Sequence, residues 1–324
     1  MKKRGELTTN KKLWIGLLIA LILILLLFLL LFFVPKLKNK TYENITSCRE
    51  LNQSNKVYYL IQNVSSNETC FNISANNVTI DCQGNMINFS SSGNVGYGII
   101  STYNLTSIKN CVLVEASNTT GNKYAIYFVN SNNGTILNNS IITLASDSQA
   151  VFFESSSYCK ISGTNVSTLG SSGTGISIKS SSDANIFLDN SIITAGSGSK
   201  AFIVDSSVDN IVSRTTIVTS GSTSQGISLY SATRSMISGS DITNSGSESR
   251  GIYLDYTTNS TIINNKISTS GSESPGIYLS YSPGNILQNN AISVTGQSVE
   301  IYIFPEPAAN EPNQPSNKTK GKPI

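Results

Sequence analysis

Tyrosines recur at a regular interval in the C-terminal half of the chain. Tyr253 and Tyr278 are 25 residues apart, and so are Tyr256 and Tyr281. An aromatic ring can stack on the apolar face of a pyranose, so tyrosines lined up along one surface could hold a saccharide. The alternative is that exposed tyrosines simply suit the surface of β-strands. The glycan-binding candidates are Tyr230, Tyr253, Tyr256, Tyr278, Tyr281 and Tyr302.

Charged residues also recur at nearly this interval. Asp209 follows Asp183 after one such step, and Arg234 follows Asp209 after the next. The two aspartates are weak candidates for a calcium site, and we predict no metal centre because two carboxylates are too few ligands. Asp189 and Arg214 are separated by the same step and most simply form a salt bridge.

A column of alternating charge is a further pattern of this kind. Glu154, Lys179 and Asp205 follow one another at successive steps of the same interval. Opposite charges at neighbouring positions of adjacent strands can pair at the surface. The spacing therefore predicts a ladder of surface ion pairs with a small contribution to stability.

The composition excludes several kinds of chemistry. The chain has no histidine, which removes His general bases, His metal ligands and Ser-His-Asp catalysis. A copper site is not expected either, because histidine is absent and Met1, Met86 and Met236 are the only methionines that could act as ligands. We therefore predict no cofactor and no catalytic residue. With a net charge of only +3, the sequence gives no reason to expect a nucleic-acid partner.

Internal repeats indicate how these residues are positioned. Three ladders of similar residues advance together in steps of 25 residues, except for one step of 26, which is the third step of the first ladder and the second step of the other two. The first has a small residue before alternating apolar residues: Ala125, Ala150, Gly175, Ala201, Gly226, Gly251 and Gly276. The second is Ile141, Val166, Ile192, Ile217, Ile242, Ile267 and Ile292. The third is Ile136, Ile161, Phe187, Val212, Ile237, Ile262 and Leu287.

The repeat predicts an all-β solenoid. Apolar residues alternate within each motif, as in a strand with one buried face, and Gly, Ser, Asn and Asp between motifs supply turns. A repeat unit this short cannot bury its own apolar face, so the units must stack into coils. Asn264 above Asn289, and Asn265 above Asn290, fit side-chain columns at a corner. Leucine-rich repeats lack their Leu frame here, and propeller blades need longer units.

The ladders also resemble a known family. Together with the segments NVTIDCQG, starting at Asn77, and SIKNC, starting at Ser107, they look like the parallel β-helix repeat family. That family includes NosD-like and CASH-type domains, the latter of carbohydrate-binding proteins and sugar hydrolases, and is common in archaeal surface proteins. The resemblance implies a right-handed parallel β-helix of about nine coils over residues 48–304. It selects no activity, because the family includes lyases, hydrolases, epimerases, adhesins and inert scaffolds.

Motifs of the enzymes in this family are missing. The Asn-x-Asp and Asp-Asp pattern of polygalacturonases and the Asp-Pro-His motif of mannuronate epimerases do not occur. Asp183, Asp209 and Arg234 are only distantly similar to the calcium-plus-arginine arrangement of pectate lyases. A glycosidase would need two clustered carboxylates. We therefore favour a non-catalytic protein, with a lyase or hydrolase acting on acidic polysaccharide as the alternative.

The five cysteines allow disulfides outside the cytoplasm. Their odd number leaves at least one thiol free or paired between chains. Cys48 and Cys70 both precede the regular repeats, so we favour them as a pair that pins the first coil. The alternative is that all five are small buried hydrophobic residues.

An apolar run near the N-terminus predicts a transmembrane helix. Leu13 to Val34 is an unbroken run of 22 apolar residues, which as a helix would span about 33 Å. Five Lys or Arg residues precede it and three follow closely, which favours a cytoplasmic N-terminus and an extracellular β-helix. Asn-x-Ser/Thr sequons after the run fit that orientation, because they are glycosylated only outside the cytoplasm. The glycosylation candidates are Asn44, Asn63, Asn72, Asn104 and Asn118.

The sequence thus predicts a single-pass cell-membrane protein that presents a β-helix to the outside. The expected partners are the membrane, glycans and other envelope proteins, and the expected role is glycan binding, adhesion or envelope structure. The predicted parts are a basic cytoplasmic N-terminus (1–12), the transmembrane helix (13–34), a stalk (35–47), the β-helix (48–304) and a Pro-rich disordered tail (305–324).

Overall fold

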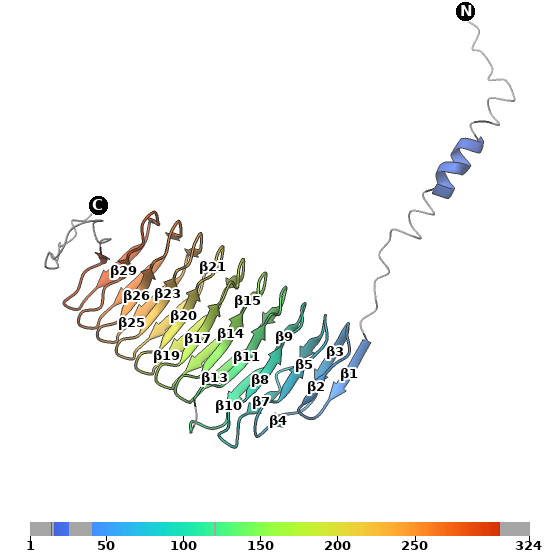
Figure 1. Cartoon of the computed structure of the whole chain (residues 1–324), viewed down its shortest axis with the longest axis horizontal. Coiled ribbons are helices and arrows are strands. Elements are labelled where there is room, and N and C mark those ends of the chain that lie inside the picture. Colours follow the sequence, from blue (N-terminus) through green and yellow to red (C-terminus); the bar gives the residue numbers. More distant parts are fainter. Residues whose placement is uncertain (1–13, 15, 26–40, 120, 305–324) are drawn as a thin grey trace, which may run out of the picture. The chain divides into compact units, whose positions relative to one another are not determined.

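The computed structural model describes residues 14, 16–25, 41–119 and 121–304. The chain divides into two units, Met1–Lys40 and Thr41–Ile324. The second unit is a right-handed parallel β-helix, whose coils follow one another in sequence order from the blue β1 to the red β29 in Figure 1. The predicted fold class of this unit is confirmed.

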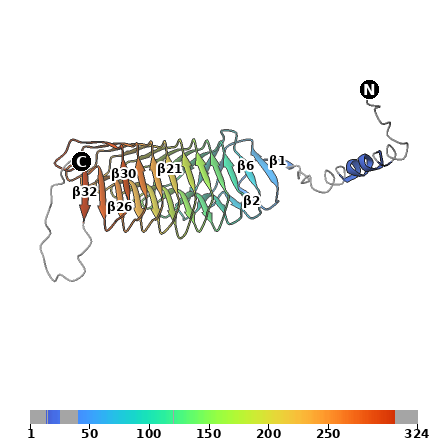
Figure 2. The same ribbon diagram turned by 90° about the horizontal axis from the view of Figure 1, so that it is seen from above.

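Three parallel sheets run along the helix, and Figure 2 shows the coils from a second side. Sheet A contains β1 (Thr41–Ile45), β3 (Lys56–Leu60), β6 (Thr79–Asp81), β9 (Ser107–Lys109), β12 (Thr135–Leu137), β15 (Lys160–Ser162), β18 (Ile186–Leu188), β21 (Ile211–Ser213), β24 (Met236–Ser238), β27 (Thr261–Ile263) and β30 (Ile286–Gln288). Sheet B contains β2 (Arg49–Leu51), β5 (Phe71–Ile73), β8 (Tyr97–Ser101), β11 (Tyr124–Val129), β14 (Gln149–Glu154), β17 (Thr174–Lys179), β20 (Lys200–Asp205), β23 (Gln225–Tyr230), β26 (Arg250–Asp255), β29 (Ile277–Ser280) and β32 (Ile301–Phe304). Sheet C contains β4 (Val64–Ser65), β7 (Met86–Phe89), β10 (Val112–Glu115), β13 (Ser140–Thr143), β16 (Asn165–Thr168), β19 (Ser191–Thr194), β22 (Thr216–Thr219), β25 (Asp241–Asn244), β28 (Lys266–Thr269) and β31 (Ala291–Val294).

Each complete coil passes through sheet A, then sheet C, then sheet B. Sheet C has ten strands, so the domain has about ten coils rather than the nine expected. The difference arises at the N-terminal end, where the coils do not follow the regular ladder. There β1 already pairs with β3, so the first strand begins at Thr41, within the segment predicted as a stalk and ahead of the expected start at residue 48.

The apolar ladders form the interior, as predicted. The third ladder lies on sheet A, where Ile161 pairs with Phe187 and Phe187 with Val212. The second lies on sheet C, where Val166 pairs with Ile192. The interior-facing members between β12 and β27 are at most 3% exposed. Because parallel strands stack at about 4.8 Å, each of these side chains packs on its equivalents above and below.

The corners depend on residues that tolerate unusual backbone. Asn264 and Asn289 both have positive φ, 56° and 52°, which asparagine adopts more readily than most residues. The predicted amide column is confirmed, because the Asn265 backbone N–H and side-chain amide both donate to Asn290 Oδ1, at 3.1 and 3.0 Å. At another corner, a Cβ on Gly246 would lie 1.8 Å from the Gly221 carbonyl oxygen, so only glycine fits.

In the N-terminal unit, residues 14 and 16–25 are helical. Their apolar side chains are exposed, with Leu17, Leu21 and Ile24 between 61% and 66% accessible. Across the described residues, the structure contains no helix that combines the length and apolarity needed to cross a membrane. Residues 13, 15 and 26–34 of the predicted transmembrane helix lie outside the described residues, as do the predicted cytoplasmic segment 1–12 and tail 305–324.

Two disulfides join neighbouring coils near the N-terminal end. Cys48 pairs with Cys70, the pair favoured from the sequence. Cys82 pairs with Cys111, which the sequence did not indicate. The bridged cysteines are 22 and 29 residues apart, and both bridges link coils that are already hydrogen-bonded. Such cross-links stabilise mainly by restricting the unfolded chain.

Cys159 is the one free cysteine of the described residues, and we expect it to be unreactive in the folded protein. Its side chain is 1% exposed, and burial raises the pKa of its thiol to about 11. Thiolate is the reactive form, so both access and ionisation oppose alkylation. Mass spectrometry after iodoacetamide treatment at pH 8 without reductant should show no label on the native protein and one label after unfolding. Labelling of the native protein would contradict this.

Candidate functional site

The outer face of sheet B brings most of the predicted binding residues together. Its outward side chains form three columns that run across successive strands. The first column is Tyr97, Tyr124, Gln149, Thr174, Lys200, Gln225 and Arg250. The middle column is Ile100, Tyr127, Phe152, Ser177, Ile203, Ser228, Tyr253, Tyr278 and Tyr302. The third column is Glu154, Lys179, Asp205, Tyr230, Asp255 and Ser280.

A tyrosine cluster occupies the C-terminal part of this face. The Tyr253 ring is 5.5 Å from that of Tyr230 and 5.4 Å from that of Tyr278, both at steep angles. Tyr278 and Tyr302 stack in nearly parallel planes at 4.7 Å. Burial, and next the nearby Asp255 carboxylate, raises the pKa of Tyr253 to about 12, so its hydroxyl stays protonated near neutral pH. The cluster offers partly exposed rings with hydroxyls that can donate hydrogen bonds.

Arg250 joins this cluster. Its guanidinium carbon lies 4.7 Å from the ring centres of both Tyr253 and Tyr278. This cation–π arrangement holds the guanidinium beside the two tyrosine rings. Within the described part of the chain, the buried Arg250 Nε has no hydrogen-bond partner. The guanidinium is therefore positioned by stacking and keeps donor capacity.

Tyr256 and Tyr281 belong to a different surface. They lie just beyond the ends of β26 and β29, both with positive φ, at the corner that leads to sheet A. Their rings stack at 5.0 Å, and Phe304 packs edge-on against Tyr281 at 5.3 Å. The six predicted tyrosines therefore divide into four on the outer face of sheet B and two at the adjoining corner.

A second aromatic cluster lies at the N-terminal part of the same face. Tyr97 and Tyr124 stack at 5.6 Å, and Tyr127 stacks on Phe152 at 5.1 Å. The Tyr127 hydroxyl donates to Glu154. Sequence reasoning followed the middle and third columns and omitted the first, so it missed Tyr97 and Tyr124. Their spacing also departs from the regular step, because the coil between them is longer.

The predicted ladder of ion pairs does not form on this face. No ion pair between described residues involves Glu154, Lys179 or Asp205. Glu154 instead accepts the Tyr127 hydroxyl, and Asp205 accepts the Ser206 hydroxyl at 2.9 Å. Nearby hydroxyl donors therefore replace the long lysine side chain as partners of the two carboxylates.

Asp183 and Asp209 do not make a metal centre either. Two guanidinium nitrogens of Arg234 bind Asp209, at 2.8 and 2.9 Å, and lower the pKa of its carboxyl group. Asp183 accepts the backbone N–H of Val208 at 2.8 Å. No group of three or more Cys, Asp or Glu side chains among the described residues could hold a metal ion. The predicted pair between Asp189 and Arg214 forms, with N–O distances of 2.7 and 3.0 Å.

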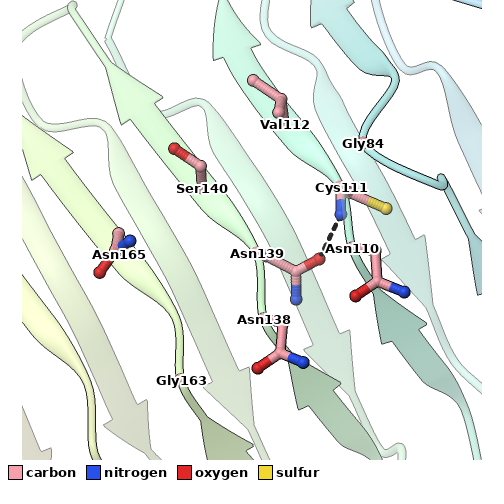
Figure 3. A pocket seen from close by; sticks show the side chains of 9 residues that line it. All are labelled: Gly84, Asn110, Cys111, Val112, Asn138, Asn139, Ser140, Gly163 and Asn165. Atoms are coloured by element: carbon pink, nitrogen blue, oxygen red, sulfur yellow. Dashed lines mark hydrogen bonds between the residues drawn. The ribbon is translucent and has the colours of Figure 1, made fainter.

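An amide-lined hollow opens near the Cys82–Cys111 bridge (Figure 3). It measures about 360 Å³ and is lined by Gly84, Asn110, Cys111, Val112, Asn138, Asn139, Ser140, Gly163 and Asn165. The Asn139 amide oxygen accepts the Cys111 backbone N–H at 2.9 Å, which fixes part of the wall. The lining contains no aromatic ring and no ionisable acid or base, so it offers neither sugar stacking nor proton transfer.

The five glycosylation candidates all have exposed side chains. Asn63 Oδ1 accepts the Met86 N–H at 2.8 Å, and Asn104 Oδ1 accepts the Asn132 N–H at 2.7 Å. A side chain must be exposed to be glycosylated, and all five meet that condition. Their hydrogen bonds hold the Asn63 and Asn104 amides close to the protein surface. Glycosylation at these positions stays a prediction.

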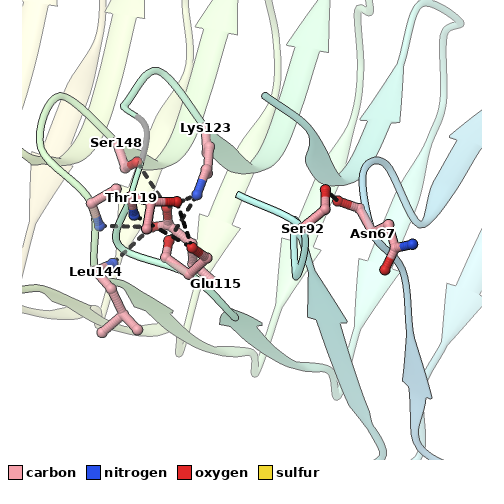
Figure 4. A network of polar contacts seen from close by, with 9 residues as sticks. Asn67, Ser92, Glu115, Thr119, Lys123, Leu144 and Ser148 are labelled. Carbon is pink, nitrogen blue, oxygen red and sulfur yellow. Dashed lines mark hydrogen bonds and ion pairs between the residues drawn. The ribbon is translucent and has the colours of Figure 1, made fainter. Parts of the chain in front are cut away.

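A buried Glu–Lys pair is the other concentration of charge (Figure 4). Glu115 and Lys123 are both fully buried, with Nζ 3.2 Å from Oε1. Glu115 also accepts the N–H groups of Leu144 and Ala145 and the Ser148 hydroxyl, at 2.7, 3.2 and 3.2 Å. Lys123 donates to the Ser117 carbonyl at 2.7 Å. The pair has no access to a substrate and serves the fold.

Comparison with known proteins gives one family and several similar folds. The model of a family described as periplasmic copper-binding protein (NosD) matches residues 82–269 and 197–306, which together are more than half of the chain. No curated protein matches.

The solved structures that are similar share the fold at low identity. A mutant tailspike protein of E. coli bacteriophage HK620, in complex with pentasaccharide, has a TM-score of 0.55 and 12% identity over 81% of this chain. The match spans 56% of the tailspike chain. A mannuronan C-5 epimerase A-module from Azotobacter vinelandii has a TM-score of 0.45 and 14% identity, over 82% of this chain and 89% of that chain. At these identities the similarity shows a fold and no activity.

Copper does not fit the residues present. Protein copper sites use His, Cys or Met ligands, and the chain has no histidine. Four cysteines are in disulfides and Cys159 is buried. Met86 is on sheet C and Met236 is on sheet A, about six coils further along. The donor set of the described residues therefore offers no place where two copper ligands of these types meet.

Proposed function

Because the chain belongs to the NosD family of parallel β-helix proteins, we propose that it is a non-catalytic saccharide-binding protein of the cell surface. The observation that carries this proposal is the outer face of sheet B. Four of the predicted tyrosines lie there with Arg250, and a second aromatic cluster lies on the same face. Aromatic rings and hydrogen-bonding side chains on one rigid surface are what binding of an extended sugar chain requires.

The fold supports this choice of face. The strands of sheet B repeat at about 4.8 Å, close to the length of one sugar unit, so a linear glycan lying along the columns would meet equivalent positions in successive coils. The bacteriophage tailspike with a similar fold is itself bound to an oligosaccharide. Several of the carboxylates that a glycosidase would need are held by tyrosine, serine or arginine donors, which favours binding over cleavage.

The proposed location is the outer surface of the cell membrane. The apolar run from Leu13 to Val34 would anchor the chain, with its N-terminus in the cytoplasm and the β-helix outside. The two disulfides fit an oxidising compartment. Archaeal origin, implied by the sequence resemblance, remains a prediction.

The test is a glycan array with the soluble part of the chain from Thr41 onwards, provided that it folds by circular dichroism, and with the full chain in detergent. We expect retention of polysaccharides, with binding about tenfold weaker in the double variant Tyr253→Ala/Tyr278→Ala, because each aromatic contact contributes roughly 0.5–1.5 kcal/mol. Tyr42→Ala is the matched control, since Tyr42 is exposed on sheet A. Equal loss in both variants, or no binding to any glycan, would reject the proposal. Cleavage of a bound glycan would instead show an enzyme.

A further inference from the structure

We infer that the saccharide held on the outer face of sheet B is anionic, and that Lys200, Lys179 and Arg250 bind its carboxylate or sulfate groups. This inference rests on the proposed function and specifies its ligand. It comes from the part of the face between the two aromatic clusters, where most outward side chains are polar or charged.

The two lysines flank the middle column in neighbouring coils. Lys200 begins β20 in the first column and pairs in register with Thr174, while Lys179 ends β17 in the third column. Ser177 and Ile203 lie between them in the middle column and are at most 7% exposed. Burial, and next the nearby Lys179 ammonium, lowers the pKa of Lys200, so the two ammonium groups are close enough to repel. An anion placed between them would relieve that repulsion.

Neither lysine is neutralised by the protein. Among the described residues, no carboxylate lies within 4.0 Å of either amino group. Glu154 and Asp205, the neighbouring acids in the third column, already accept hydrogen bonds from Tyr127 and Ser206. The two ammonium groups in this part of the face therefore have no direct ion-pair partner among the described residues.

The charge is also distributed unequally across the face. The first column contains two cations, Lys200 and Arg250, and no acid. The third column contains three acids and one cation, Lys179, and its Asp255 shares β26 with Arg250. An acidic sugar could place its anionic group along the first column and donate hydroxyl hydrogen bonds to the third. A neutral sugar would leave the first-column cations without partners.

Two unpartnered polar atoms complete the site. Ser177 Oγ is fully buried, and neither it nor Gln149 Oε1 has a hydrogen-bond partner within the described part of the chain. Ser177 shares β17 with Lys179, and Gln149 lies on the neighbouring strand β14, where it pairs in register with Thr174. An unpaired buried polar atom costs about 1–3 kcal/mol, so a sugar hydroxyl that reached either atom would recover that cost.

The experiment measures binding of three polymers to the full chain in detergent: polygalacturonate for carboxylates, heparin for sulfates and dextran as a neutral control. We expect polygalacturonate or heparin to bind and dextran to bind much more weakly, with affinity that falls as salt is raised. Lys200→Gln should weaken binding of the anionic polymer about tenfold, because charged hydrogen bonds are the stronger ones. Lys200→Arg should restore most of it. Lys160→Gln, an exposed lysine on sheet A, is the matched control and should change nothing.

The outcomes separate the two proposals. Dextran binding as tightly as the anionic polymers, or Lys200→Gln binding like the parent protein, overturns the anionic ligand and leaves saccharide binding in place. Failure of all three polymers, together with an empty glycan array, rejects saccharide binding itself. A preference between polygalacturonate and heparin identifies the anionic group as carboxylate or sulfate.

Discussion

Lys123→Met is expected to destabilise the β-helix by about 3–5 kcal/mol, because it leaves the Glu115 carboxylate buried without a countercharge. Methionine keeps most of the lysine volume, so packing alone would cost far less. Solvent cannot take the place of the ammonium, since both side chains are fully buried. Urea unfolding followed by circular dichroism would measure the change in the free energy of unfolding.

A double variant separates lost charge pairing from lost volume. Glu115→Gln/Lys123→Met carries no buried charge and keeps an amide oxygen for the N–H groups of Leu144 and Ala145. We expect it to recover a large part of the stability lost in Lys123→Met, as replacing a whole buried pair is commonly close to neutral. If both variants unfold at the same urea concentration, the destabilisation has another origin. A loss below about 1 kcal/mol in the single variant would contradict the buried pair.

Phe187→Ala is expected to cost about 3–5 kcal/mol through the cavity it creates in the middle of the stack. The Phe187 ring is fully buried and packs against Phe202 at 4.8 Å and Phe153 at 6.1 Å. In a solenoid each coil is stabilised by its two neighbours, so a cavity weakens both interfaces. The midpoint of thermal unfolding should therefore fall by several degrees.

Ile186→Ala is the control for that substitution. Ile186 precedes Phe187 on β18 and is 37% exposed on the outer side of the strand. It removes a similar kind of side chain from the same strand without opening the interior, so we expect a change of about 1 kcal/mol or less. Similar losses in both variants would mean that strand propensity at β18, and not core packing, determines the stability of this coil.

The regular coils were predictable because two separate ladders of apolar residues repeat with the same spacing along the chain. The spacing from Ile161 to Phe187 has one extra residue, and the same extra residue appears between Val166 and Ile192, so the register could be followed through the irregular coil. The alternation of apolar residues within each strand then indicated which side chains face the interior and which face outward. The membrane anchor could be recognised from composition alone, and stays a prediction.

The remaining parts could not be read from spacing. Glu115 and Lys123 lie on either side of a longer turn between β10 and β11, outside the repeating pattern, so their pairing depends on the path of that turn. The Cys82–Cys111 bridge joins corners after β6 and β9, and only the register of Ile80 with Ile108 would have suggested it. That Lys179 and Lys200 on sheet B have no ion-pair partner could not be predicted either. It depends on Glu154 and Asp205 accepting hydrogen bonds from nearby hydroxyl groups, and side-chain rotamers and local turns determine those contacts.

The constant length of the C-terminal coils has a consequence for how such a molecule changes in evolution. From β20 to β29 every strand of sheet B bonds to an equivalent strand in the same register, so the top and bottom of one coil are nearly interchangeable with those of the next. In-frame duplication of a single coil would insert a module that matches both neighbours and lengthens the molecule by about 4.8 Å. Descendants of one gene can thus acquire longer or shorter surfaces in unit increments, while each inherited module retains its side chains in alignment.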